Sequence, residues 1–269
     1  MSSHFHHKPR KRFGQHFLTN TGVITDLVRA INPQVGDKLV EIGPGLGALT
    51  SYLLPLVKTM EVIELDRDLI APLQDACENL GSLLIHQASV LDFDFTRLTD
   101  IPHSLRVVGN LPYQISTPII FHLIAQIAVI KDMHFMLQKE VVERLAANPG
   151  SKTYGRLSIM VQYQLDVEEL FTVAAEAFDP PPRVTSAVVR LWPKSSYQRA
   201  EDYGLFSAIV KQAFNHRRKT LSNSLKEFIT AEKLADLGID PHRRPEELAV
   251  AEFVKISNAL FQVGNGSKV

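Results

Sequence analysis

The sequence predicts an α/β protein in which a parallel, doubly wound sheet is followed by a small helical domain. Short apolar runs alternate with amphipathic segments over the first two thirds of the chain, as is typical of parallel strands joined by helices. A glycine-rich turn separates one of these runs from the next amphipathic segment. From about Tyr203 onward, apolar residues recur at helical spacing without strand-like runs between them.

The first half of the chain begins with a helix that Thr19, Asn20 or Thr21 can cap, and strand 38–42 then leads into the glycine turn 43–47. The helix after this turn is expected to bend or end near Pro55, because proline lacks the N–H that helices need. In chain order, the next elements are predicted as a strand at 59–65, a helix at 68–79, and strands at 83–86 and 106–108.

The second half continues the alternation and then changes character. A helix is expected to open at Ser116-Thr117-Pro118, where proline suits the first turn. A strand at 133–137, a helix at 141–147, and strand-like runs at 167–173 and 187–192 complete the sheet in a mixed sense. The polar stretch 193–200 has little periodicity, so we divide the chain into domains 1–196 and 197–269.

Composition sets limits on compartment and partners. The chain has 269 residues, 45% of them hydrophobic, and a formal net charge of zero, so no global basic field indicates a nucleic-acid partner. The single cysteine, Cys77, excludes an internal disulfide and favours a reducing cytoplasm. We expect a cytoplasmic protein without a signal peptide, membrane span or metal site. Two basic clusters stand out, one around Lys11 and Arg12, and one at 217–219.

The glycine turn and a downstream acid predict a nucleoside site. Residues 41–47 read E-I-G-P-G-L-G between a strand and a helix, where glycines allow a ligand to approach the backbone. Glu64 closes the next strand, and a carboxylate there can accept hydrogen bonds from ribose hydroxyls. The turn is shorter than the dinucleotide fingerprint G-x-G-x-x-G, which weakens an NAD-binding interpretation. The pattern resembles class I methyltransferases, whose cofactor, S-adenosylmethionine, has a nucleoside but no pyrophosphate.

Residues 109–113, G-N-L-P-Y, follow the apolar run 105–108. On its own the stretch fits an ordinary turn, since Asn, Pro and Gly are frequent turn residues. It also resembles the N-[LP]-P-Y motif of N6-adenine methyltransferases. There, Asn110 and the Leu111 carbonyl would hold the two protons of the target amine, Pro112 would stiffen this clamp, and Tyr113 would stack on the extruded base.

Four further stretches make the resemblance more specific. They resemble, in order along the chain, signatures of the rRNA adenine N6-dimethyltransferase family, and most of all its bacterial small-subunit branch. The stretches are K-R-F-G-Q-H-F-L at 11–18, M-L-Q-K-E-V at 136–141, F-D-P-P-P-R-V at 178–184 and F-N-H-R-R-K-T-L at 214–221. The resemblance implies a Rossmann-like class I methyltransferase domain with a small all-helical C-terminal domain.

The resemblance also implies the site residues. His16 and Leu18 would contact the cofactor, Gly43 would lie under its amino-acid part with Gly45 in the same turn, and Glu64 would hold its ribose. Asn110 would sit between cofactor and target, and Phe178 would flank the base. One position departs from the family: Ser89 stands where an aspartate usually binds the cofactor adenine, and Asp92, three residues on, is an alternative acid.

The expected partner is 16S rRNA within the small (30S) ribosomal subunit, where the small-subunit branch dimethylates two adjacent adenosines near the 3′ end, and we expect a monomer. Lys11, Arg12, Arg217, Arg218 and Lys219 are then expected to contact RNA phosphates. Three alternatives remain open. They are a relative that methylates 23S rRNA, an rRNA-binding assembly factor whose chemistry is incidental, and an NAD oxidoreductase, which the short glycine motif disfavours.

Overall fold

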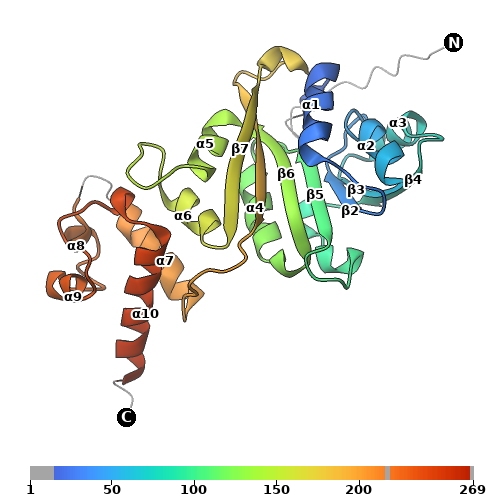
Figure 1. The fold of residues 1–269 in the computed structure, drawn as a ribbon. Helices are drawn as coiled ribbons and strands as arrows, with labels where there is room; N and C mark the ends of the chain where they lie inside the picture. Colours follow the sequence, from blue (N-terminus) through green and yellow to red (C-terminus); the bar gives the residue numbers. More distant parts are fainter. Residues whose placement is uncertain (1–14, 216–218, 267–269) are drawn as a thin grey trace. The chain divides into compact units, whose positions relative to one another are not determined.

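The computed structural model describes residues 15–215 and 219–266, which form two compact units (Figure 1). The first contains the described residues up to Val142 and the segment Val167–Pro193. The second contains Glu143–Asp166 and the described residues from Lys194 onward. The expected domain boundary after residue 196 lies close to Pro193, where the chain passes from the first unit to the second for the last time. The segment 143–166 also joins the second unit, because its Tyr163 ring packs on Phe206 with centroids 4.6 Å apart.

A seven-stranded sheet organises the first unit, as the sequence predicts. Its strand order is β4-β3-β2-β5-β6-β9-β7; β2 to β6 run parallel, and β9 is antiparallel to β6. The Rossmann-like α/β fold with a mixed sheet is therefore confirmed. The strands are β2 (Lys38–Ile42), β3 (Thr59–Glu64), β4 (Ser82–Gln87), β5 (Leu105–Asn110), β6 (Ile130–Gln138), β7 (Leu165–Val173) and β9 (Ser186–Pro193).

Helices connect these strands and cover the sheet. The main ones are α1 (Thr21–Ile31), α2 (Thr50–Val57), α3 (Ile70–Ala76), α4 (Ser116–Ile124) and α5 (Lys139–Leu145). Asn20 caps α1 by accepting hydrogen bonds from the N–H groups of Gly22 and Val23. Pro55 lies inside α2 rather than at its end. The helix ends soon afterwards at Val57, so it closes near Pro55 as expected.

A second, two-stranded sheet was not predicted. It pairs β1 (Phe17–Leu18) with β8 (Phe178–Asp179) in antiparallel register, so Leu18 lies opposite Phe178. These strands are too short to show any alternation in the sequence. They bring the segment before α1 beside the proline-rich loop that precedes β9. Short 3-10 turns complete the unit at Arg67–Leu69, Val90–Asp92, Phe95–Leu98, Ile127–Val129 and Ala175–Ala177.

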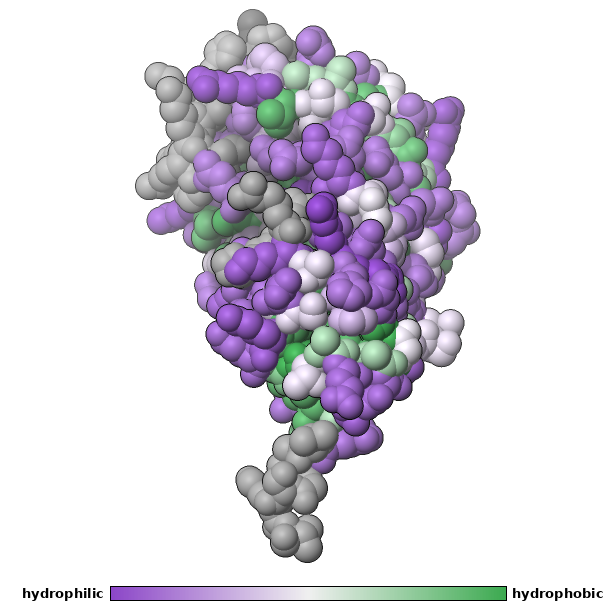
Figure 2. Space-filling model, turned by 90° about the vertical axis from the view of Figure 1, so that its left-hand side faces the viewer, coloured by the Kyte–Doolittle hydropathy of each residue, from purple (hydrophilic) through white to green (hydrophobic). Residues whose placement is uncertain are grey.

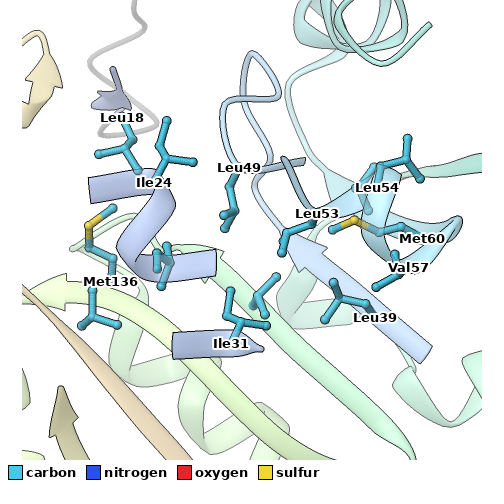
Figure 3. Packing of buried hydrophobic residues seen from close by; sticks show 14 of the residues in the cluster. Leu18, Ile24, Ile31, Leu39, Leu49, Leu53, Leu54, Val57, Met60 and Met136 are labelled. Atoms are coloured by element: carbon cyan, nitrogen blue, oxygen red, sulfur yellow. The ribbon is translucent and has the colours of Figure 1, made fainter. Parts of the chain in front are cut away.

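The core lies on both faces of the large sheet. On one face, side chains of α1 and α2 pack on β2, β3 and β6 (Figure 3). Leu73 of α3 and Val108 of β5 belong to the same cluster. Ile24, Leu27 and Ile31 of α1 are each 3% exposed or less. Alternate strand residues such as Val40 and Phe135 are fully buried as well, so the opposite face is also covered. Burial on both faces explains why the strands read as apolar runs.

One polar cluster interrupts the apolar core at the amino ends of β5 and β6. The buried Arg106 makes a paired contact with Asp132, at 2.9 and 3.0 Å, and a 2.7 Å contact with Asp37. The same guanidinium donates to the carbonyls of Ile31 and Asn32, at 2.6 and 3.3 Å, where α1 ends. Arg106 thereby satisfies carbonyls that a helix leaves without partners, and fixes α1 to the sheet.

The described part of the second unit is helical apart from the first two residues of β7. Its helices are α6 (Arg156–Gln162), α7 (Tyr203–Phe214), α8 (Leu221–Ser224), α9 (Ala231–Asp236) and α10 (Val250–Gly266), with a 3-10 turn at Pro245–Glu247. The sequence analysis did not predict α6. The face drawn in Figure 2 is mostly hydrophilic, with apolar residues in scattered areas rather than one large patch.

Candidate active site

A cavity of about 600 Å³ opens at the carboxyl ends of the central strands of the first unit. This is where ligands bind in doubly wound sheets. Its walls come from the segment before α1, the glycine turn, the end of β3, the turn after β4 and the segment after β5. Ten of the predicted site residues line it: His16, Leu18, Gly43, Gly45, Glu64, Ser89, Asn110, Leu111, Pro112 and Tyr113.

The glycine turn and Glu64 form one hydrogen-bonded unit. Gly45 has φ +61° and donates its N–H to Glu64 Oε2 at 3.2 Å, while the Asp66 N–H donates to Oε1 at 2.8 Å. A Cβ on Gly45 would also come within 3.1 Å of the Phe17 ring, so the position suits glycine on two counts. Burial raises the pKa of Glu64, and these backbone hydrogen bonds oppose that rise.

Glu41 places a second carboxylate in the cavity wall. It is 2% exposed and accepts a 2.6 Å hydrogen bond from the Thr50 hydroxyl. Burial, with a contribution from the charge on Glu64, raises the pKa of Glu41 to about 7. Among the described residues, neither glutamate has a basic side chain as an ion-pair partner. Both glutamates line the cavity, and no described residue supplies a counter-charge to them.

The segment before α1 closes one side of the cavity. Gln15 donates to Asp66 at 3.1 Å, and Phe17 lies against Gly45. The His16 Nδ1 lies 2.7 Å from the Pro180 carbonyl. Because a carbonyl only accepts, Nδ1 carries a proton and donates it to Pro180. The ring of His16 thus ties this segment to the proline-rich loop.

Asn110, the last residue of β5, contacts the same segment. Its Nδ2 donates to the His16 carbonyl at 2.9 Å, which assigns the orientation of the side-chain amide. No group in the described chain donates to its Oδ1, so this acceptor stays available at the cavity wall. Gly109 precedes it because a Cβ there would lie 2.5 Å from the Ile42 carbonyl of β2. Close strand packing therefore sets the position of the amide.

Tyr113 has two restraints of its own. Its hydroxyl lies 2.6 Å from Ser186 Oγ, and its ring stacks on His16 with centroids 5.8 Å apart and planes 23° apart. Burial raises the pKa of the Tyr113 phenol, and the hydrogen bond with Ser186 opposes that rise. The sequence analysis missed Ser186. The only hint of a residue such as Ser186 is that the hydroxyl of a half-buried tyrosine needs a hydrogen-bond partner, and the sequence does not identify that partner.

Of the remaining predicted residues, two are described and do not line the cavity, and four lie outside the described residues. Phe178 is 3% exposed, packs in the core beside Leu18 and does not line the cavity, because its pairing in β8 directs it inward. Ser89 lines the cavity, whereas Asp92 is exposed and does not. Lys219 is exposed in the second unit. Lys11, Arg12, Arg217 and Arg218 lie outside the described residues.

No group of three or more His, Cys, Asp or Glu side chains in the described residues is arranged to hold a metal ion. None of the described helices has the length and apolar character needed to cross a bilayer.

Known proteins resemble this chain over nearly its full length. Among curated proteins, ribosomal RNA small subunit methyltransferase A of Nitrosococcus oceani is 54% identical over 252 residues, covering 93% of this chain and 96% of the relative. The protein of the same name from Pseudomonas fluorescens is 51% identical over 263 residues, covering 97% of each.

Solved structures share the fold. A dimethyladenosine transferase from Plasmodium falciparum superposes with a TM-score of 0.80 at 28% identity, covering 93% of this chain and 98% of that one. The 23S rRNA methyltransferase ErmE gives a TM-score of 0.72 at 20% identity, covering 91% and 100%, and this likeness shows the fold alone. A family model described as ribosomal RNA adenine dimethylase matches residues 6–262. With this match and relatives more than 50% identical, the chain belongs to the ribosomal RNA adenine dimethylase family.

Proposed function

We propose that this protein transfers methyl groups from S-adenosylmethionine to N6 of two adjacent adenosines near the 3′ end of 16S rRNA. The products would be N6,N6-dimethyladenosines in the small ribosomal subunit, made at a late step of its biogenesis in the cytoplasm. The observation that carries the proposal is the meeting of Asn110, Tyr113 and the Glu64-braced glycine turn in one cavity.

The cavity suits the proposed cofactor in size and chemistry. About 600 Å³ lies within the range of small-molecule sites. Each oxygen of Glu64 accepts one backbone hydrogen bond and retains capacity to accept another from a ribose hydroxyl. Gly43 and Gly45 would lie under the amino-acid part, with His16 and Leu18 beside it. Ser89 would accept the adenine amine proton more weakly than an aspartate, because it carries no charge.

The target amine needs positioning more than activation. Bound S-adenosylmethionine would supply an electrophilic methyl group to N6, its sulfur would keep the electron pair of the broken carbon–sulfur bond, and the methylated amine would release a proton to solvent. The free Asn110 Oδ1 and the Leu111 carbonyl would accept the N6 protons and direct the lone pair toward that methyl group. Tyr113 would stack on the base.

The substrate follows from the relatives. The two bacterial proteins reported above are named as methyltransferases of small-subunit ribosomal RNA. Lys11, Arg12, Arg217, Arg218 and Lys219 would contact phosphates and set the register of the RNA. Neutralising Arg217 and Arg218 together should weaken binding to small subunits. The slope of log affinity against log salt concentration should become shallower by the amount expected for about two phosphate contacts. An unchanged salt slope would remove these arginines from the interface.

Transfer of tritiated methyl groups tests the function directly. The protein is incubated with labelled S-adenosylmethionine and with 30S or 50S subunits that lack the modification. We expect label only in 30S subunits, recovered as N6,N6-dimethyladenosine at two adjacent positions. Label in 50S subunits would assign the protein to 23S rRNA. Binding to 30S subunits with no label in either would favour an assembly factor.

A further inference from the structure

We propose that Ser186 is a positioning residue that sets the orientation of the Tyr113 ring through its hydroxyl. The inference rests on the proposed function, because a fixed ring matters only if the ring stacks on the target base. It makes the Tyr113 hydroxyl a structural anchor, so that the ring alone meets the substrate.

The tether joins the ring to a rigid part of the sheet. The Tyr113 hydroxyl lies 2.6 Å from Ser186 Oγ, and Ser186 is fully buried. Ser186 opens β9 and pairs with Gln138, the last residue of β6. Both strands are interior to the seven-stranded sheet, so the serine cannot move far without breaking backbone pairing. The far end of the tyrosine side chain is thereby anchored to the sheet.

A second restraint acts on the face of the same ring. The His16 ring stacks on it at 5.8 Å, and His16 is itself bonded to the Pro180 carbonyl at 2.7 Å. At the backbone end, Ser116 Oγ donates to the Tyr113 carbonyl at 3.1 Å. The ring is therefore restrained at its backbone, on one face and at its hydroxyl.

The hydroxyl restraint comes from Ser186, just after the proline-rich loop, and the restraint on the ring face comes from His16, which is bonded to the Pro180 carbonyl of that loop. Pro180 and Ser186 flank this loop, so the ring, the loop and the segment before α1 form one assembly around the cavity. Without the hydroxyl tether, the aromatic ring would keep its backbone position but could tilt about its side-chain torsions. Misplacement of a positioning group by about 1 Å can cost about 100-fold in rate, and a tilt of one restrained ring should cost less.

The test compares Ser186→Ala, Tyr113→Phe and the double variant. Each single change should lower kcat for methyl transfer to 30S subunits by about tenfold. The double variant should be no slower than either single variant, because both changes remove the same hydrogen bond. The dissociation constant of S-adenosylmethionine, measured by calorimetry, should stay within about twofold of wild type. Ser257→Ala is a matched control, since Ser257 is also fully buried but its hydroxyl has no partner within the described residues.

A spectroscopic measurement tests the tether without any activity. Alkaline difference spectra, with Tyr113→Phe as the reference that lacks this phenol, report the titration of Tyr113. Ser186→Ala should raise the pKa of Tyr113 above its value in the wild type, because the opposing hydrogen bond is lost. Wild-type kcat in Ser186→Ala, additive losses in the double variant, or an unchanged titration would each overturn the proposal. If the wild-type protein transfers no methyl group, the proposed function fails while the titration still decides on the tether.

Discussion

Polar side chains gather at both ends of the central strands, but the two clusters are built differently. At the amino ends, Arg106 is surrounded by two carboxylates and two carbonyls at the end of α1, so its charge is fully paired. At the carboxyl ends, Glu41 and Glu64 line a cavity and have no basic ion-pair partner among the described residues. We call the first cluster closed, because Arg106 and its two carboxylates compensate each other, and the second open, because its acids have no basic partner among the described residues.

This difference distinguishes polar side chains that stabilise the sheet from polar side chains that can bind a ligand. In the amino-end cluster, burial lowers the pKa of His134 to about 4, so this residue is neutral near pH 7. The carboxylates beside it are compensated by Arg106 and, for Asp37, by Lys131 at 3.5 Å. Within the described residues, the carboxyl-end cluster has acids without basic partners and an Asn110 Oδ1 without a donor, and burial raises the pKa values of Glu41 and Glu64. Active sites often carry such perturbed groups.

The largest effect should come from Asn110→Ala in the open cluster. Removing the amide takes away the acceptor that would orient the target amine, so we expect methyl transfer to 30S subunits to fall below detection. The thermal midpoint of unfolding should change little, since the lost hydrogen bond to the His16 carbonyl is worth about 1 kcal/mol. Affinity for S-adenosylmethionine should stay within a few-fold of wild type. Normal turnover by this variant would exclude the clamp role.

Asp132→Ala should have the reverse profile, because it opens the closed cluster. Losing one partner leaves the buried Arg106 undercompensated, and breaking such pairs costs about 3 to 5 kcal/mol of folding free energy. Asp26→Ala is the matched control: its pair with Arg29 spans 3.2 Å at an exposed surface and should contribute less than about 1 kcal/mol. Urea unfolding of both variants measures the contrast. Equal losses would show that the Arg106 cluster is not a structural anchor.

Particular residues show what the sequence could and could not predict. The alternation of strands and helices follows from the sequence pattern, and Glu64 ends β3 and lines the cavity because strand ends meet at one edge of the sheet. Phe178 was expected beside the base, yet its pairing with Leu18 in β1 turns it into the core. Two-residue strands leave no periodic signal. The Ser186 tether, the Arg106 cluster and the segment 143–166 all depend on contacts between residues far apart in sequence, which local patterns do not encode.

Glu41→Gln should give a smaller, pH-dependent effect that sharpens the contrast between the clusters. The pKa of Glu41 is about 7 when folded, against an ordinary value of 4.5. Below pH 4.5 both states hold the proton, and burial of Glu41 costs little. As the pH rises toward 7, only the unfolded state releases it, so the wild type loses about 3 kcal/mol of unfolding free energy. The glutamine can still accept the Thr50 hydroxyl bond without a charge.

The free energy of unfolding of the ligand-free protein, measured in urea at pH 5 and pH 8, is the relevant readout. The free energy of unfolding of Glu41→Gln minus that of wild type should increase from pH 5 to pH 8, and most of the increase should be reached by pH 8. An exposed carboxylate provides the control, and Glu78→Gln should follow the wild-type curve at both pH values. Parallel curves for wild type and Glu41→Gln would mean that the open cluster carries no buried charge penalty. The two ends of the sheet would then differ in geometry alone.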